Sequence, residues 1–411
     1  MLYVVKRDGR EVEFNSDKIA QAIKGSASEI GLTLKESEVL TTVAKVTDYI
    51  EIEYKKSITV EQIQNQGHID IAVAYSTYRK ERTKVREIKS DLMKAIRQIG
   101  VETDRDNANV GNNFSSKLLR IASESNKWNT LAVMPKNLAK AHETGDLYYH
   151  DLDSYNLTVN CLHIPTKEML VDGFNTGYGT INAPKRIETA AELSCILLQS
   201  TQNDMFGGQS HPDFDNDMAI FVEPTREEVR KELEELGVPS EKIDELTEKK
   251  VNKRVHQAMQ GVVYNLNTMH SRAGSQVPFS SINLGLPDSD DAALVCEIFL
   301  LEYEKGLGKG EQPIFPNIIF RVKDGVNREE GDPYFYLYKL ACRVAAKRMN
   351  PTFMNIDADF NKEYYDRGYV PATMGCRTYL MKNVNGEPGC KGRGNIAPTT
   401  MNLPRIGLQA K

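Results

Sequence analysis

The chain has 411 residues, of which 52 are Lys or Arg and 57 are Asp or Glu, and 40% are hydrophobic. This length allows two or three domains, and a net charge of -5 argues against a nucleic-acid-binding protein. Because no apolar run reaches the roughly 20 residues that cross a bilayer, and the start lacks a signal-peptide core, we predict a cytoplasmic protein without a membrane span.

Residues 1–95 are predicted to form a separate module that begins with a β-hairpin. Two short strand-like runs, Leu2–Val5 and Glu11–Phe14, flank the dipeptide Asp8-Gly9. Because Asp-Gly favours tight two-residue turns, these runs are expected to pair as an antiparallel hairpin.

Helices are predicted to follow the hairpin. Asn15 and Ser16 can cap a helix that begins near Asp17, and amphipathic patterns indicate further helices over 36–50 and 59–78. A polar stretch at 102–109 lacks periodicity and is the best candidate for a linker.

From residue 108 onward, long helical segments alternate with short apolar runs, a pattern that favours a parallel α/β sheet or barrel. The runs are Leu157–Ile164, Gln276–Ile282, Ile314–Val322, Thr352–Ile356 and Asn402–Ile406. Residues 223–258 are dense in charge; Thr225 with Glu228 predicts a capping box, and Gly237 predicts the turn of a helical hairpin.

Basic side chains surround the first hairpin and the helix after it. Lys6, Arg7 and Lys18 would lie near free backbone N–H groups at the start of that helix, an arrangement that suits a triphosphate. A plain basic surface hairpin is the alternative that spacing alone leaves open.

The first module resembles the ATP-cone, an allosteric nucleotide-binding domain. The resemblance is carried by Val5–Arg10, Phe14–Ile19, Ser57–Ile63 and Ala74–Arg82. It implies that ATP or dATP binds here as an effector and contacts Lys6, Arg7, Asn15, Lys18 and Thr59.

The six cysteines contain no CxxC pair, so a zinc framework or a disulfide scaffold is disfavoured. Cys195, Cys296 and Cys342 lie on apolar helical patterns and are predicted to be core residues.

Three other cysteines lie where chemistry is more accessible. Cys161 ends a strand-like run, Cys376 follows Met374-Gly375, and Cys390 lies in a Gly-rich stretch. Strand ends and loops expose reactive thiols more often than helix faces do.

Residues 105–411 resemble the class III, anaerobic ribonucleoside-triphosphate reductases, which are glycyl radical enzymes. The resemblance implies an α/β fold that forms the N-terminal part of a ten-stranded barrel with a finger loop. It rests on the strings Asp106–Val110, His142–Leu152, Asn160–Leu162, Gly173–Gly179, Gln202–Ser210, His270–Asn283, Pro313–Lys323, Met374–Arg377 and Asn402–Ile406.

The resemblance implies anaerobic reduction of ribonucleoside triphosphates to deoxyribonucleoside triphosphates by thiyl radical chemistry. Cys376 would hold the thiyl radical, Cys161 would supply hydrogen to C2′ of the ribose, and Asn395 would be the active-site asparagine, with Asn402 as the alternative. Formate would be the usual reductant; a thioredoxin-type partner acting through Cys390 is the other possibility.

Residues near this candidate site have less specific readings. Ser280, Ser281 and Asn283 follow a strand-like run and could line a substrate pocket or pack the strand end. The His and Asp residues of the segment 206–217 are read as a capped turn, so no metal ligand is predicted.

The family also implies parts that this sequence lacks: a zinc site and the glycyl radical loop, both C-terminal. We therefore expect a truncated chain that needs a C-terminal reductase portion and a radical-SAM activase, and that forms a homodimer. The alternative is a catalytically inactive, nucleotide-binding regulatory fragment.

Overall fold

The computed structural model describes residues 3–5, 11–13, 15–29, 35–53, 92–99, 113–155 and 159–410. The chain divides into two compact units, Met1–Ala95 and Ile96–Lys411, and each is described by itself. Across the described residues, no helix combines the length and the apolar character that crossing a membrane requires.

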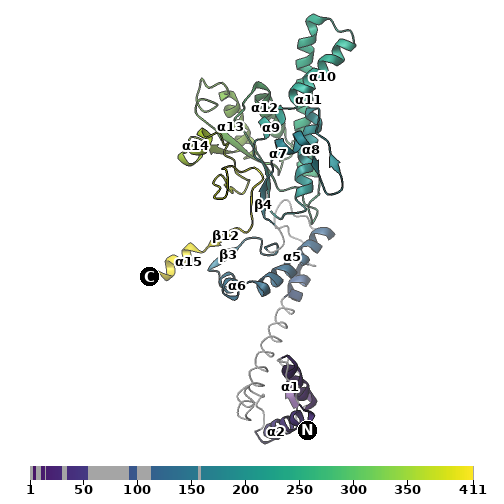
Figure 1. The fold of residues 1–411 in the computed structure, drawn as a ribbon, viewed down its shortest axis with the longest axis vertical. Helices are drawn as coiled ribbons and strands as arrows, with labels where there is room; N and C mark the ends of the chain where they lie inside the picture. The colour runs from purple at the N-terminus through teal and green to yellow at the C-terminus, as the bar shows by residue number, and fades with distance from the viewer. Residues whose placement is uncertain are drawn as a thin grey trace. The chain divides into compact units, whose positions relative to one another are not determined.

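The first unit begins with the predicted hairpin, drawn in purple in Figure 1. Strand β1 (Tyr3–Val5) pairs antiparallel with β2 (Glu11–Glu13), which confirms the hairpin. The predicted turn at Asp8-Gly9 and the predicted helix over 59–78 lie outside the described residues.

Two helices follow in the first unit. Helix α1 (Asp17–Glu29) begins where predicted, because Asn15 Oδ1 accepts a hydrogen bond from the Asp17 N–H at 2.8 Å. Ile23 of α1 packs against Val39 and Val43 of α2 (Glu36–Glu53).

The second unit is built on a sheet of six strands in the order β10-β9-β8-β7-β4-β11. The strands from β4 to β10 run parallel, and only β11 is antiparallel to its neighbour. This confirms the predicted parallel α/β organisation. The bounds are β4 (Cys161–His163), β7 (Gln209–His211), β8 (Ser280–Leu284), β9 (Asn317–Val322), β10 (Thr352–Asn355) and β11 (Gly394–Asn395).

Helices connect the parallel strands and bury one face of the sheet (Figure 1). On β8, Ile282 and Leu284 join the hydrophobic core that these helices share. Ser281 and Asn283 point to the opposite face, because side chains alternate along a strand. The principal covering helices are α8 (Ile187–Thr201), α11 (Ser240–Thr268), α12 (Asp290–Lys305) and α13 (Phe335–Arg348).

The remaining elements flank this sheet. They are α5 (Phe114–Val133), α6 (Lys136–Glu143), β3 (Leu147–Tyr149), α7 (Thr166–Asp172), β5 (Phe174–Asn175), β6 (Thr180–Ile181), α9 (Phe214–Ala219), α10 (Val222–Glu235), α14 (Asp359–Asp366), β12 (Thr399–Met401) and α15 (Leu403–Gln409). Residues 92–99 form a further helix, which crosses the boundary between the two units.

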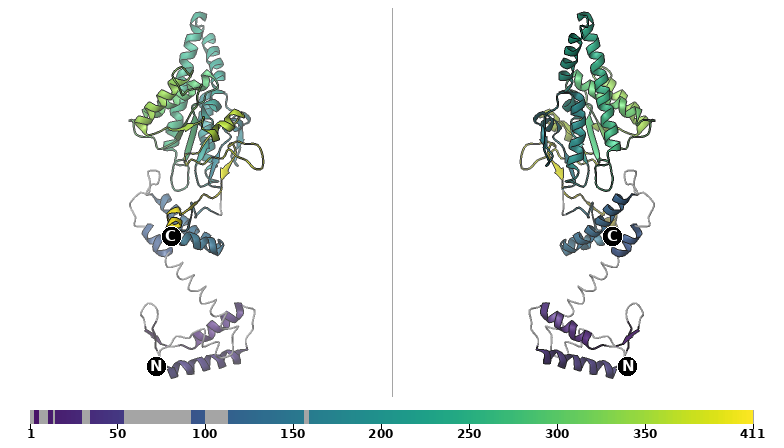
Figure 2. Two further views of the ribbon diagram at one scale, coloured as in Figure 1. Left: turned by 90° about the vertical axis from the view of Figure 1, so that its left-hand side faces the viewer. Right: turned by 90° about the vertical axis from the view of Figure 1, so that its right-hand side faces the viewer.

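The predicted charged hairpin is confirmed as α10 and α11, which project together from this unit (Figure 2). The predicted capping box is wrong, because Thr225 lies inside α10 rather than before it. Its hydroxyl donates to the Phe221 carbonyl at 2.6 Å and accepts from the Ile187 N–H at 3.0 Å.

Two other predictions are corrected. The run Asn402–Ile406 was expected to be strand-like but starts helix α15: Asn402 Oδ1 accepts from the Arg405 N–H at 3.1 Å, and Pro404 occupies the first turn. Cys342 was expected in the core, but it lies on the exposed side of α13, whereas Cys195 and Cys296 are buried.

Candidate active site

Cys161, Asn395 and Cys376 come from separate segments and meet at one end of the sheet. Cys161 is the first residue of β4, and Asn395 on β11 is its register partner. Asn395 Oδ1 accepts a hydrogen bond from the Cys161 N–H at 2.9 Å, and Asn395 Nδ2 donates to Thr378 Oγ1 at 3.1 Å. Thr378 Oγ1 in turn lies 3.1 Å from Cys376 Sγ. The amide of Asn395 therefore links the two candidate cysteines.

Cys376 lies at the exposed tip of a tight loop. Thr373 and Tyr379 form a β-bridge that closes the loop, and the Arg377 N–H donates to the Met374 carbonyl at 2.8 Å. Arg377 adopts a φ of 72°, a left-handed conformation that turns the chain back directly after Cys376.

Strand β8 holds this loop in place. The Ser281 hydroxyl oxygen accepts from the Gly375 N–H at 3.1 Å. Asn283 accepts from the Thr373 N–H at 3.1 Å and donates to the Thr373 carbonyl at 2.9 Å. These contacts give Ser281 and Asn283 a role in packing the strand against the loop.

Ser280, Ser281 and Asn283 are all buried. The Ser280 hydroxyl points to the other face of β8 and has no hydrogen-bond partner among the described residues. A role for the three side chains in a substrate pocket stays a prediction.

Glycines let the backbone approach the two cysteines closely. A Cβ on Gly375 would lie 2.7 Å from Asn317 Nδ2, and a Cβ on Gly207 would lie 2.7 Å from Cys161 Sγ. A Cβ on Gly394 would collide with the Cys161 carbonyl oxygen. Side chains at these positions would displace the loop or the strands, so the cysteine arrangement depends on glycine there.

The environment separates the acidities of the two thiols. The neighbouring Cys161 thiol is the largest cause that lowers the pKa of Cys376. Partial burial opposes this shift, and hydrogen bonding with Thr378 adds to it. The same contact, together with burial, raises the pKa of Cys161. Cys376 is therefore the thiol that ionises first, and Cys161 keeps its proton.

Cys390 is placed differently. It is buried and packs with Ala372 and Met381, and burial raises its pKa to about 11. The apolar surroundings give this thiol a packing role beneath the loop. Asn402, the alternative to Asn395, caps α15 and donates to the Gly145 carbonyl at 2.8 Å.

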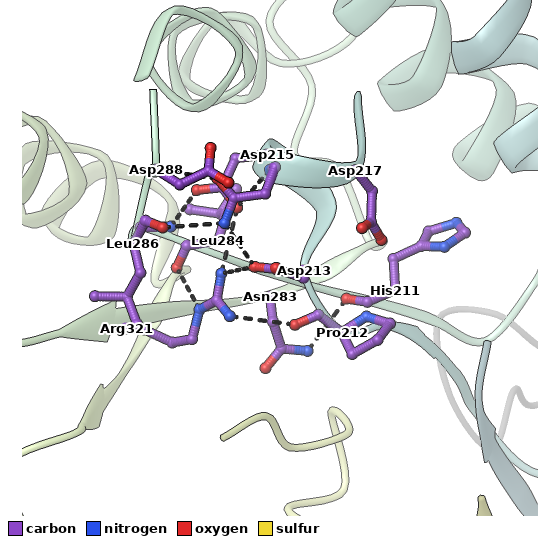
Figure 3. A network of polar contacts seen from close by, with 12 residues as sticks. His211, Pro212, Asp213, Asp215, Asp217, Asn283, Leu284, Leu286, Asp288 and Arg321 are labelled. Atoms are coloured by element: carbon purple, nitrogen blue, oxygen red, sulfur yellow. Dashed lines mark hydrogen bonds and ion pairs between the residues drawn. The ribbon is translucent and has the colours of Figure 1, made fainter. Parts of the chain in front are cut away.

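A buried ionic network ties the carboxyl ends of β7, β8 and β9 together (Figure 3). Arg321 of β9 is fully buried and lies 2.6 Å from Asp213 and 3.3 Å from Asp215. Asp215 also accepts from the Gly285 N–H at 2.7 Å. The sequence analysis predicted neither this network nor the contact of Thr378. The signal for the network was Arg321 within an apolar run, and the signal for Thr378 was a hydroxyl two residues after Cys376.

Within the described ranges, no three His, Cys, Asp or Glu side chains are grouped closely enough to hold a metal ion. In the first unit, Asn15 caps α1 and Lys18 is exposed on the first turn of that helix. The other predicted nucleotide contacts, Lys6, Arg7 and Thr59, lie outside the described residues.

The chain matches two known protein families. The family described as anaerobic ribonucleoside-triphosphate reductase matches residues 106–411, and the ATP cone domain matches residues 2–84.

Curated relatives agree with the first match. The chain is 31% identical to an anaerobic ribonucleoside-triphosphate reductase of Escherichia coli over 427 residues, and 30% identical to one of Haemophilus influenzae over 429 residues. The alignments cover 100% and 99% of this chain but 59% of each relative.

Solved structures share the fold. The anaerobic ribonucleotide reductase of Thermotoga maritima in complex with dATP and CTP superposes with a TM-score of 0.50 at 19% identity, covering 80% of this chain and 57% of that chain. Another anaerobic ribonucleotide reductase superposes with a TM-score of 0.50 at 17% identity over 99% of this chain and 58% of that chain.

Proposed function

Because the chain belongs to the anaerobic ribonucleoside-triphosphate reductase family, we propose that its second unit carries the two-thiol part of a site that reduces ribonucleoside triphosphates to deoxyribonucleoside triphosphates. The observation that supports this proposal is the chain of hydrogen bonds that joins Cys161 to Cys376 through the Asn395 amide and the Thr378 hydroxyl. Two thiols with opposite shifts of acidity suit two different roles in one reaction.

In the proposed reaction, the sulfur of Cys376, as a thiyl radical, takes the hydrogen atom from C3′ of the ribose. The C3′–H bond breaks, an S–H bond forms, and the unpaired electron moves to C3′. The 2′-hydroxyl then leaves as water with the proton of the 3′-hydroxyl, which leaves a 3′-ketone and the unpaired electron on C2′. Cys161, whose raised pKa keeps the hydrogen on its sulfur at neutral pH, gives a hydrogen atom to C2′ and becomes a thiyl radical.

Two electrons and two protons must then be supplied, to restore the Cys161 thiol and to reduce the 3′-ketone to the C3′ radical, and one of the protons comes from water. We propose formate as the reductant, because its oxidation to carbon dioxide releases two electrons and a proton. Cys376 returns its hydrogen atom to C3′ at the end, which regenerates the thiyl radical. A glycyl radical would supply the initial oxidation of Cys376 by taking its hydrogen atom.

The experiment is anaerobic reconstitution of the chain with a C-terminal reductase portion and a radical-SAM activase, followed by measurement of deoxyribonucleotides. Cys376→Ser and Cys161→Ser should each abolish product, whereas Cys342→Ser, an exposed thiol on α13, should leave it unchanged. Product formation by Cys376→Ser at the normal rate would rule out the proposed thiyl site.

We propose that the first unit binds ATP or dATP as an effector. The support is the match to the ATP cone domain and the positive charge of Lys18, which is exposed on the first turn of α1. Calorimetry of the chain with each nucleotide tests this. Lys6→Ala and Lys18→Ala should weaken binding, and Lys24→Ala, farther along α1, should not; no saturable heat would contradict it.

A further inference from the structure

We propose that Thr378 is a positioning residue for Cys376, and that its hydroxyl donates a hydrogen bond to the Cys376 sulfur because Asn395 occupies the hydroxyl oxygen from the other side. The proposal rests on the proposed function only for the role of Cys376 as the reacting thiol. The geometric evidence is three consecutive hydrogen bonds, which run from the Cys161 N–H to Asn395, from Asn395 to Thr378, and between Thr378 and Cys376.

The first step is the orientation of the Asn395 amide. The Cys161 backbone N–H can only donate, so the amide atom 2.9 Å from it must be the oxygen Oδ1. The other end of the same planar group is therefore the NH₂ group, and it faces Thr378 Oγ1 at 3.1 Å. The backbone of β4 thereby decides which way the amide points.

The second step is the direction of the Thr378 hydroxyl. Asn395 Nδ2 can only donate, so Thr378 Oγ1 accepts from it and keeps its own hydrogen for another partner. Cys376 Sγ lies 3.1 Å from Oγ1 and can accept that hydrogen. The loop keeps the two side chains opposed, because the Met374 N–H donates to the Thr378 carbonyl at 3.2 Å.

The third step is the consequence for Cys376. The residue lies at an exposed loop tip, where a thiol would ordinarily sample several rotamers. The Thr378 hydroxyl, 3.1 Å from its sulfur, restricts this freedom by giving the sulfur a fixed donor. A β-branched residue suits this task, because threonine has few χ1 rotamers and keeps its hydroxyl in one place.

The test is the pH profile of Cys376 alkylation by iodoacetamide in the absence of oxygen, read by mass spectrometry of the peptide that contains Cys376 after the reaction is quenched and the chain digested. Thr378→Val removes the hydroxyl and nearly conserves the shape, and Thr378→Ser keeps the hydroxyl. Thr378→Val should raise the midpoint of the profile by about one pH unit, which is about ten-fold slower alkylation below the midpoint. Thr378→Ser should retain the wild-type midpoint.

Alkylation of the exposed Cys342 in the same samples is the internal reference and should not change. Circular dichroism identifies loss of folding; if Thr378→Val is unfolded, Thr378→Ala takes its place with the same expected shift. An unchanged midpoint in the folded variant overturns the proposal, as does an equal shift with serine.

This readout needs no turnover, so the two proposals fail separately. A shifted midpoint together with full nucleotide reduction by Cys376→Ser would keep the hydroxyl assignment and reject the proposed function. An unchanged midpoint together with loss of product in Cys376→Ser would do the reverse.

Discussion

The Cys161 N–H donates a 2.9 Å hydrogen bond to Asn395 Oδ1, although the two residues are 234 positions apart in the chain. This contact lies at the edge of the parallel sheet, where the antiparallel strand β11 pairs with β4. It brings the amide within reach of Thr378 and so connects the strand cysteine to the loop cysteine.

Replacement of Cys161 should alter the acidity of Cys376. The Cys161 thiol is the main group that stabilises the Cys376 thiolate, so Cys161→Ala should raise the pKa of Cys376 toward the ordinary thiol value. Cys161→Ser retains a donor and should keep the pKa low. Titration of the thiolate absorbance, with Cys376→Ser as the blank, measures this, and an identical titration of the alanine and serine variants would contradict it.

Alanine at Gly394 should disrupt the pairing of β11 with β4. The added methyl group would collide with the Cys161 carbonyl oxygen, so the strands must separate, at a cost of about 1–3 kcal/mol. Thermal denaturation should show the loss, and hydrogen exchange should show faster exchange of the Cys161 amide.

Gly308→Ala is the matched control for this substitution, because a Cβ there meets no atom within 4 Å. It should leave both measurements unchanged. Equal stability of the Gly394→Ala and Gly308→Ala variants would show that β11 does not lie as close to β4 as described.

Loss of the Arg321 side chain should strongly destabilise the second unit. Arg321→Met leaves Asp213 and Asp215 without their buried counter-charge, which typically costs about 3–5 kcal/mol. Chemical denaturation measures the change. The triple variant that adds Asp213→Asn and Asp215→Asn should recover much of the lost stability, because it removes the uncompensated carboxylates. No recovery would show that lost packing, rather than unpaired charge, causes most of the destabilisation.

Asp217→Asn should stabilise the chain increasingly as the pH rises. Burial raises the pKa of Asp217 to about 8, although Lys391 lies 3.9 Å away and opposes the shift. Between the ordinary carboxyl pKa near 4 and about 8, the folded state holds a proton that the unfolded state releases, so the stability of the wild type falls with rising pH, by at most about 1.4 kcal/mol per unit.

Asparagine does not titrate, so the difference in the free energy of unfolding between Asp217→Asn and the wild type should be small near pH 4 and largest above pH 8. Denaturation curves at several pH values test the sign. A difference that does not vary with pH would mean that Asp217 is ionised in the folded protein.

Local patterns in the sequence were sufficient to predict the hairpin of β1 and β2, the start of α1 at Asn15, and the α10–α11 hairpin. These features depend on neighbours in the chain: a turn dipeptide, a cap, and a periodic apolar face. The parallel sheet also followed from the alternation of helical segments with short apolar runs. The family resemblance, rather than periodicity, selected Cys161, Cys376 and Asn395 as candidates.

The failures lie where local pattern and tertiary context disagree. The run Asn402–Ile406 is apolar enough for a strand, but Asn402 and Pro404 together start a helix. Cys342 follows the apolar pattern of α13, yet it faces away from the sheet, because only one side of the helix is covered.

The sequence by itself determined most of the helices and strands, the division of the chain into two units and the residue types available for chemistry. Only the tertiary structure decided that Asn395 rather than Asn402 pairs with Cys161, that Thr378 contacts Cys376, and that Arg321 is buried between two aspartates. The physical reason is that a hydrogen bond or a buried charge pair depends on which strands become neighbours, and strand order is set by the burial of the whole sheet rather than by any local stretch of residues.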